Sequence, residues 1–209
     1  MTDRKKIFFE GLSKKLNLLG FQHLKSRNGF VKKNITEEFC IEFQTWPQFI
    51  QISPSYIIYV KSIEDIKKEA FGKSYIRIGS VGNDLTQLII NKVPVLSWTD
   101  TEENIVKAIE YQFGLYLAYG VDFFNDFSRI DYLDEVLNTD SINSIRNLGI
   151  NPKNKIYLSV ITAFLNRNPN LINILKENEE KAKMLPPGAL DLEQYISLRD
   201  LILLKVNKH

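Results

Sequence analysis

The residues best suited to chemistry in this 209-residue chain are one cysteine, Cys40, and one internal histidine, His23. A catalytic thiol needs a base and an electropositive setting, so the two side chains would have to meet across paired strands. Cysteine also packs well as a small hydrophobic residue, and we favour that interpretation for Cys40. Because the chain has a single cysteine, it excludes an intrachain disulfide framework and any zinc or iron–sulfur site built from several cysteines.

Carboxylates are dense between residues 122 and 135, where the chain carries Asp122, Asp126, Asp131, Asp134 and Glu135. Calcium loops need alternating oxygen ligands with a central glycine and a closing glutamate, and this segment lacks that order. A pair of carboxylates for glycoside hydrolysis depends on a separation that sequence spacing does not define. We interpret these residues as helix caps and solvated faces, and we predict no metal site.

The glycines do not match the templates for phosphate binding. The segment from Ile78 to Asn83 contains Gly79 and Gly82 after a predicted strand. It lacks the lysine of a nucleotide-binding loop and the third glycine of a dinucleotide loop. The sequence therefore predicts no catalytic residue and no cofactor, and it favours a non-enzymatic function.

Charge is unevenly distributed, although the formal net charge is only +2. Residues 1–33 hold nine Lys and Arg against Asp3 and Glu10, a balance of +7, and residues 100–140 hold ten Asp and Glu against Lys107 and Arg129, a balance of −8. The basic segment could contact nucleic-acid phosphates. The candidate contacts are Lys5, Lys6, Lys14, Lys15, Lys32 and Lys33. We favour the alternative that the basic and acidic helices lie near each other or are each solvated.

Hydrophobic periodicity places the first half of the chain on a helix and a sheet. Phe8, Leu12 and Leu16 share a helical face, and Gly20 stands where a left-handed residue would end that helix. Residues 39–43 alternate between apolar and polar side chains, as in a half-buried strand. We expect further strands near residues 30–31, 50–52, 56–60 and 75–81, with a turn at residues 53–55. Such closely spaced strands predict an antiparallel meander.

The second half of the chain is predicted to be helical. Asp100 and Glu103 fit a capping box, after which Ile105, Ile109, Phe113 and Leu117 recur every four residues. We expect a short helix from residue 128, a linker at 151–154, a helical hairpin over 155–183 and a terminal helix over 190–206. The fold class is therefore α+β, with an N-terminal helix packed on an antiparallel β-sheet meander and a helical C-terminal half. We divide the chain into an α+β domain (1–140) and a helical extension (141–209) packed on it.

The order of these elements resembles the bacterial domain-of-unknown-function 4304 family over about residues 5–138. The similarity is carried by Leu18-Leu19-Gly20-Phe21, by Gly29-Phe30-Val31-Lys32-Lys33, by Tyr75-Ile76-Arg77-Ile78 and by the segment from Tyr119 to Ser128. This chain has Asp122 where the family segment often has proline, and it continues beyond residue 140. Because small proteins of this kind are often discussed with immunity proteins of toxin systems, the resemblance implies a binding role and no catalytic residue.

These observations together predict a non-enzymatic protein-binding module, of the kind that inhibits a toxin as immunity proteins do. Segregated charge suits the steering of a charged partner, and aromatic side chains are favoured anchors at interfaces. The candidate partner-binding residues are Trp46, Phe49, Trp98, Asp122, Phe123, Phe124 and Asp126. The alternative is a nucleic-acid-binding protein that uses the basic helix and hairpin. The charged N-terminus and the short apolar runs predict a cytoplasmic protein without a membrane segment.

Overall fold

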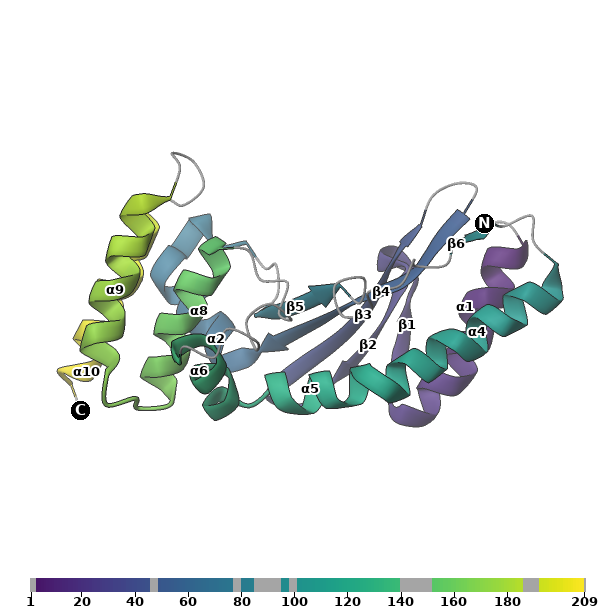
Figure 1. Cartoon of the computed structure of the whole chain (residues 1–209), viewed down its shortest axis with the longest axis horizontal. Helices are drawn as coiled ribbons and strands as arrows, with labels where there is room; N and C mark the ends of the chain where they lie inside the picture. Colours follow the sequence, from purple (N-terminus) through teal and green to yellow (C-terminus); the bar gives the residue numbers. More distant parts are fainter. Residues whose placement is uncertain are drawn as a thin grey trace. The chain divides into compact units, whose positions relative to one another are not determined.

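The computed structural model describes residues 3–45, 49–76, 80–84, 95–97, 101–139, 152–185 and 192–208. It has an N-terminal helix, an antiparallel sheet and a helical C-terminal half, so the predicted α+β class is confirmed (Figure 1). The strands are β1 (Gln22–Leu24), β2 (Gly29–Lys33), β3 (Glu37–Thr45), β4 (Phe49–Val60), β5 (Val81–Asp84) and β6 (Val95–Ser97).

The helices are α1 (Asp3–Leu16), α2 (Lys61–Phe71), α4 (Glu102–Leu115), α5 (Val121–Phe127), α6 (Ile130–Asn138), α8 (Pro152–Leu165), α9 (Leu171–Met184) and α10 (Leu192–Val206). Short 3-10 turns η1 (Asn17–Leu19), η2 (Lys25–Arg27) and η3 (Gly72–Ser74) join some of them, and a π-helical turn, η4 (Tyr116–Gly120), joins α4 to α5. None of the helices in the described ranges is long and apolar enough to cross a membrane.

The strands follow one another across the sheet in sequence order from β1 to β5, and β6 pairs with β4. The β1–β2 and β2–β3 pairs are antiparallel, with His23 opposite Phe30 and Phe30 opposite Ile41. Gly20 ends the N-terminal helical segment in the left-handed conformation, with φ +86°, as predicted. The register of β1 to β3 therefore determines which of their side chains lie on the same face of the sheet.

The chain divides into two compact units, one comprising Met1–Ile58 and Gly82–Asn125 and the other Tyr59–Val81 and Asp126–His209. Each is described below by itself. The prediction that residues 141–209 form an extension packed on the first part stays a prediction.

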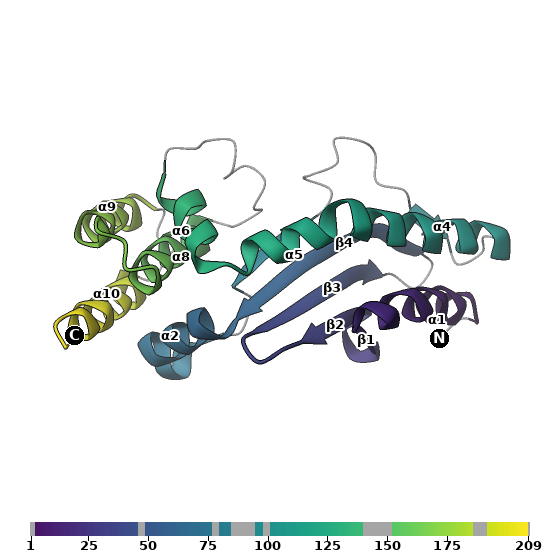
Figure 2. The ribbon, with the colours of Figure 1, turned by 90° about the horizontal axis from the view of Figure 1, so that it is seen from below.

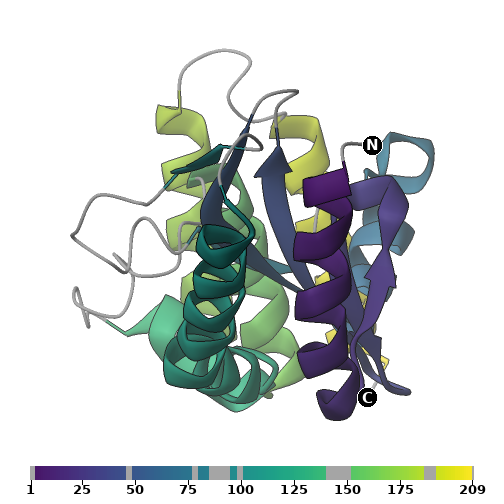
Figure 3. The same ribbon diagram turned by 90° about the vertical axis from the view of Figure 1, so that its right-hand side faces the viewer.

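In the first unit, helices α1 and α5 cover the same face of the sheet. Phe39 and Phe43 lie on one face of β3, because side chains alternate along a strand. The ring of Phe43 packs 5.7 Å from that of Phe8 in α1, and the ring of Phe39 packs 5.0 Å from that of Phe124 in α5. Helices α1 and α4 pack against each other, and Figure 3 shows both on the near side of the strands.

The second unit contains the predicted helical hairpin, formed by α8 and α9. Helix α10 packs against α2, α8 and α9, and α6 packs against α8. The carboxylate of Asp134, only 3% exposed, accepts hydrogen bonds from the side-chain amides of Asn138 (2.7 Å), Asn166 (2.7 Å) and Asn168 (2.9 Å). These bonds join α6 to the turn between α8 and α9, and they give both oxygens of the buried carboxylate hydrogen-bond partners.

Several expected boundaries in these segments are wrong. Strand β4 continues through the expected turn at residues 53–55, and Pro54 is buried within it. Proline is tolerated in a strand wherever no N–H is needed for the ladder. Residues 61–71 form α2, which the sequence analysis did not anticipate. Of the expected strand at 75–81, residues 75 and 76 belong to no strand, residues 77–79 lie outside the described residues, and β5 begins at Val81. Pro152 begins α8 instead of belonging to a linker.

The apolar repeat predicted for α4 is only partly correct. Helix α4 begins after Thr101, whose hydroxyl accepts a hydrogen bond from the Asn104 amide. Ile105 and Ile109 are buried as expected, but Leu117 is 51% exposed. A helix turns by about 100° per residue, so a strict four-residue repeat drifts by about 40° at each step and by about 120° over twelve residues. The buried face therefore passes instead through Gln112 and Tyr116.

A substitution at Gly29 tests the packing of β2 on β3. A Cβ atom at this position would lie 2.4 Å from the backbone oxygen of Ile41, so Gly29→Ala should lower the free energy of unfolding by on the order of 2–3 kcal/mol. The control is Gly114→Ala in α4, where a Cβ atom would have nothing within 4 Å and should stabilise the helix by about 0.5–1 kcal/mol. Urea denaturation measures both, and equal effects would contradict the described register.

Candidate functional site

Cys40 and His23 lie on opposite faces of the sheet and cannot form a catalytic pair. His23 is opposite Phe30, which is opposite Ile41, so these three side chains share a face. Cys40 is the neighbour of Ile41 along β3 and therefore points to the other face. The imidazole stacks between the rings of Phe9 (4.9 Å) and Phe30 (5.2 Å), and burial, followed by the charge of Lys25, lowers its pKa.

Cys40 fits the packing role that the sequence analysis favoured. The residue is only 1% exposed. Burial, followed by the nearby charges of Glu38 and Glu42, raises the pKa of the thiol to about 12. A thiol with so high a pKa carries almost no thiolate at neutral pH, and the thiolate is the nucleophile.

The acidic residues between 122 and 135 do not converge on a common point. Asp134 is bound by the three asparagine amides, whereas Asp131 pairs with Arg129 on the surface. Within the described ranges, no group of three or more His, Cys, Asp or Glu side chains is placed to hold a metal ion. Asp122, Asp131 and Glu135 are exposed, as expected for solvated faces, but Asp134 is buried within α6, so the interpretation as a cap or solvated residue is wrong for it.

A second buried polar cluster lies in the second unit, around Glu64 of α2. Its carboxylate accepts hydrogen bonds from the hydroxyls of Tyr75 (2.6 Å) and Ser80 (2.7 Å) and from the ammonium of Lys67 (3.2 Å). The Ser80 hydroxyl in turn accepts from the backbone N–H of Val60 at 2.9 Å. Burial lowers the pKa of Lys67, while its contact with Glu64 opposes that change. The three donors occupy the carboxylate, so the cluster secures α2 to the segment that follows it.

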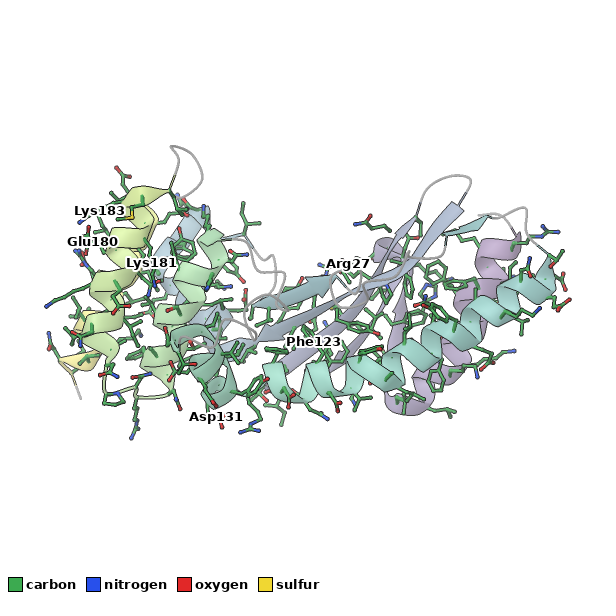
Figure 4. All side chains as sticks on the ribbon, in the orientation of Figure 1. Arg27, Phe123, Asp131, Glu180, Lys181 and Lys183 are labelled. Carbon is green, nitrogen blue, oxygen red and sulfur yellow. The ribbon has the colours of Figure 1, made fainter. Side chains whose placement is uncertain are left out.

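The candidate interface aromatics are divided between core and undescribed positions. Phe123 and Phe124 are 5% and 4% exposed, and they pack with Tyr56 and Tyr116. Figure 4 shows the labelled Phe123 between α5 and the strands. These two rings form the core of the first unit and cannot act as exposed anchors. Core packing, a common role of large aromatic side chains, accounts for both of them.

The other candidate interface residues have different positions. Trp46 and Trp98 lie outside the described residues, and Phe49 is the first residue of β4. Asp122 is exposed on α5, and Asp126 is half-buried on the same helix. Among the candidates whose side chains the structure describes, Asp122 is the one that is fully exposed, as a partner-binding residue should be.

Most of the candidate nucleic-acid lysines already make contacts within the first unit. Lys15 pairs with Glu110 (2.9 Å), Lys33 with Glu38 (3.0 Å) and Lys6 with Glu10 (3.9 Å). The ammonium of Lys5 donates to the Thr45 hydroxyl, and that of Lys32 lies over the ring of Phe21. Lys14 is exposed at the end of α1. The six lysines therefore do not form one free cationic surface.

The basic helix α1 and the acidic helix α4 are direct neighbours, which is one of the two arrangements that the charge pattern favoured. At Gly11, a Cβ atom would lie 2.5 Å from Cδ1 of Ile109, so glycine permits a close approach of the two helices. The Lys15–Glu110 pair crosses the same contact, and the Lys15 ammonium also lies 5.1 Å from the ring centroid of Phe113. Part of the charge segregation is therefore compensated inside one unit. Figure 2 shows α1 and α4 flanking the strands from below.

The opposite face of α4 is exposed and continues through η4 into α5. We call this face the outer strip. Its large side chains are 42–52% exposed, its small residues allow close approach, and carboxylates are spread along it. Its members are Val106, Tyr111, Leu117 and Tyr119, the small residues Gly114 and Ala118, and the carboxylates Glu103, Glu110 and Asp122. Spacings of three and four residues put most of them on one helical face.

The sequence pattern does not predict the exposed apolar members of the outer strip. The four-residue repeat places Leu117 in the core, and nothing in it points to Tyr111 or Tyr119. The drift of that repeat around the helix is a signal that could have found Leu117, whereas the π turn at Tyr116–Gly120 is seen only in the structure. Such turns are rare and occur frequently at functional sites.

The buried side of the π turn has polar atoms without partners. The Tyr56 hydroxyl and both amide atoms of Gln112 are buried and make no hydrogen bond within the described structure. Burial, followed by the neighbouring Tyr116, raises the pKa of Tyr56 well above its ordinary value. Gly120 is required here, because a Cβ atom would lie 2.7 Å from Cδ2 of Tyr116 and 3.0 Å from Cζ of Tyr56. The turn therefore packs tightly under the outer strip.

Comparison of the chain with protein-family models, with curated proteins and with solved structures finds no match.

The reactivity of Cys40 checks the burial of its thiol. At pH 8 the native protein should react with a thiol-specific chromogenic disulfide far more slowly than the urea-unfolded protein, because a thiol of pKa about 12 is almost fully protonated. Absorbance after mixing follows the reaction. Equal rates in the native and unfolded protein would contradict the described position of Cys40.

Two fully buried tyrosines provide a matched test of the unpartnered hydroxyl. Tyr56 and Tyr195 are both 0% exposed, but only Tyr195 has a partner, the backbone oxygen of Leu175. We expect Tyr56→Phe to raise the free energy of unfolding by about 1 kcal/mol and Tyr195→Phe to lower it by about 1 kcal/mol. Urea denaturation of both variants gives the comparison. A loss of stability in Tyr56→Phe would show that its hydroxyl has a partner.

Proposed function

We propose that this chain is a non-enzymatic protein-binding module and that the outer strip is its contact surface. The observation that carries the proposal is the exposure of Tyr111 (42%), Leu117 (51%) and Tyr119 (44%) on the continuous helical segment of α4 and η4. The other face of this segment packs on α1 and, through Tyr116, on Phe21 and Tyr56. Tyrosine is enriched at the centres of protein interfaces, where its ring buries a large area at a low entropic cost. A neighbouring set of exposed apolar side chains is a typical feature of an interaction surface.

An immunity-type inhibitor of a bacterial toxin, acting in the cytoplasm, is the specific form of this proposal. The family resemblance over residues 5–138 implies that form. The acidic character of residues 100–140 supports it, because charged surfaces steer the association of oppositely charged proteins. The nucleic-acid alternative has less support, since Lys15 and Lys33 are engaged in ion pairs within the first unit.

Site-specific photocrosslinking in the native host tests the proposed surface. A photoreactive amino acid is placed at Ala118 in the outer strip or, as a control, at Ile172 in α9, which is also exposed (48%). We expect one protein to be crosslinked from position 118 and not from position 172. That protein, once purified, should bind the full chain in a one-to-one complex by calorimetry.

The substitution Leu117→Ser should weaken this complex by about tenfold, because an anchor residue typically contributes at least about 1.4 kcal/mol. Circular dichroism checks that the variant is folded. The absence of a specific crosslink from position 118, or a complex that is unaffected by Leu117→Ser, would refute the proposed contact surface.

A further inference from the structure

The charge of the outer strip indicates the chemistry of its partner. Residues 102–127 carry five carboxylates, Glu102, Glu103, Glu110, Asp122 and Asp126, against the single cation of Lys107, a balance of −4. Glu103 lies near the beginning of the strip and Asp122 near its end. At a rise of about 1.5 Å per residue, the two positions are on the order of 28 Å apart. The exposed apolar side chains lie between them.

Internal ion pairs leave the carboxylates at the two ends of the strip open to a partner. Glu103 pairs with Lys107 at 2.7 Å, but these side chains are 75% and 70% exposed, so water screens the pair and it contributes little. Glu110, near the middle of the strip, is compensated by Lys15 at 2.9 Å within the first unit. Asp122 makes no ion pair with any residue in the described part of the chain. A partner can therefore interact with Glu103 and Asp122 without first breaking a strong internal contact.

The same arrangement disfavours a second copy of this chain as the occupant. If two outer strips packed antiparallel, Glu103 of each copy would face Asp122 of the other. If they packed parallel, each carboxylate would face its own counterpart. Both orientations bring like charges together, which weakens association. The strip instead fits a chain of opposite charge.

We infer that the outer strip binds a protein segment with an apolar centre and with arginine or lysine at both ends. Arginine suits the site best, because its planar guanidinium pairs with carboxylates and also stacks on exposed rings such as those of Tyr111 and Tyr119. The apolar centre of the partner would cover Leu117 and approach closely at Gly114 and Ala118. This inference deepens the proposed function and rests on it.

Two synthetic helical peptides of about 20 residues, a length that matches the span of the strip, provide the test. Both have the same alanine and leucine centre, and one has arginines at both ends where the other has glutamates. Fluorescence anisotropy of each labelled peptide is measured against the full chain. We expect the arginine peptide to bind and the glutamate peptide not to bind. Affinity should fall by about tenfold between about 0.05 and about 0.5 M NaCl, as exposed charges become screened.

Matched variants separate this site from general electrostatic attraction. The pair Glu103→Gln and Asp122→Asn should weaken binding of the arginine peptide by about fivefold or more, and Leu117→Ser should do the same. The control pair Glu177→Gln and Glu180→Gln removes two exposed carboxylates from α9 and should leave affinity unchanged. Equal effects of the two pairs would overturn the inference, as would equal binding of both peptides or of neither.

The results that would refute a cationic partner differ from those that would refute the proposed protein-binding function. Suppose that a protein crosslinks at position 118 and binds the Glu103→Gln, Asp122→Asn chain as tightly as the unsubstituted chain. The proposed protein-binding function would then stand, and a cationic partner would be refuted. A dimer of the full chain in sedimentation that Leu117→Ser dissociates would refute it too, because the occupant would then be a second copy. Absence of any crosslink would count against the module as well as the inference.

Discussion

The close contact between α1 and α4 is the constraint on which the rest of the first unit depends. The missing side chain at Gly11 makes room for it, since a Cβ atom there would lie 2.5 Å from Cδ1 of Ile109. The contact fixes which face of α4 is buried and, as a consequence, which face is left for a partner. It also brings Lys15 of the basic helix to Glu110 of the acidic helix. In the sequence, the basic and acidic segments suggested two separate binding surfaces. In the structure, part of their charge is paired within the first unit.

The aromatic face of the sheet provides the base for that contact. Phe43 of β3 packs on Phe8 and Phe9 of α1, and Phe39 packs on Phe124 of α5, so a single strand contacts both helical segments. Between α4 and α5, the π turn begins with a buried Tyr116 and an exposed Leu117, so the boundary between the core and the outer strip passes between these two residues. The second unit uses a different principle, in which the buried carboxylate of Asp134 is surrounded by asparagine amides. Such a network gives directional bonds to a helical core that otherwise packs through non-directional contacts.

The sequence predicted the features that depend on local patterns. The N-terminal helix with its left-handed Gly20, the alternating residues of β3 and the hairpin of α8 and α9 follow from periodicity and capping alone. Helix α2 was missed because its buried positions, such as Ile63 and Ile66, are few and directly follow a strand. The extent of β4 was missed because Pro54 usually marks a turn. The pairing of β4 with its neighbouring strands overrides the local preference of proline for a turn.

The candidate site was less predictable, because exposure depends on tertiary packing. Phe123 and Phe124 have the composition of interface anchors, yet the sheet and η4 bury them. Leu117 has the composition of a core residue, yet the rotation of α4 exposes it. Where a π turn interrupts a helix, the periodicity of the sequence does not show which side chains face the solvent. The charge of residues 100–140 was readable from the sequence, but the pairing of Glu110 with Lys15 required the fold.

Nuclear magnetic resonance of the methyl-labelled full chain tests the orientation of α4 most directly. We expect a nuclear Overhauser effect between the δ1 methyl of Ile109 and the α protons of Gly11, since these groups are in contact. We also expect a dissolved paramagnetic agent to broaden the methyl signals of Leu117, which is 51% exposed, and not those of Ile109, which is 6% exposed. A protected Leu117 together with no signal between Ile109 and Gly11 would contradict the described orientation of α4.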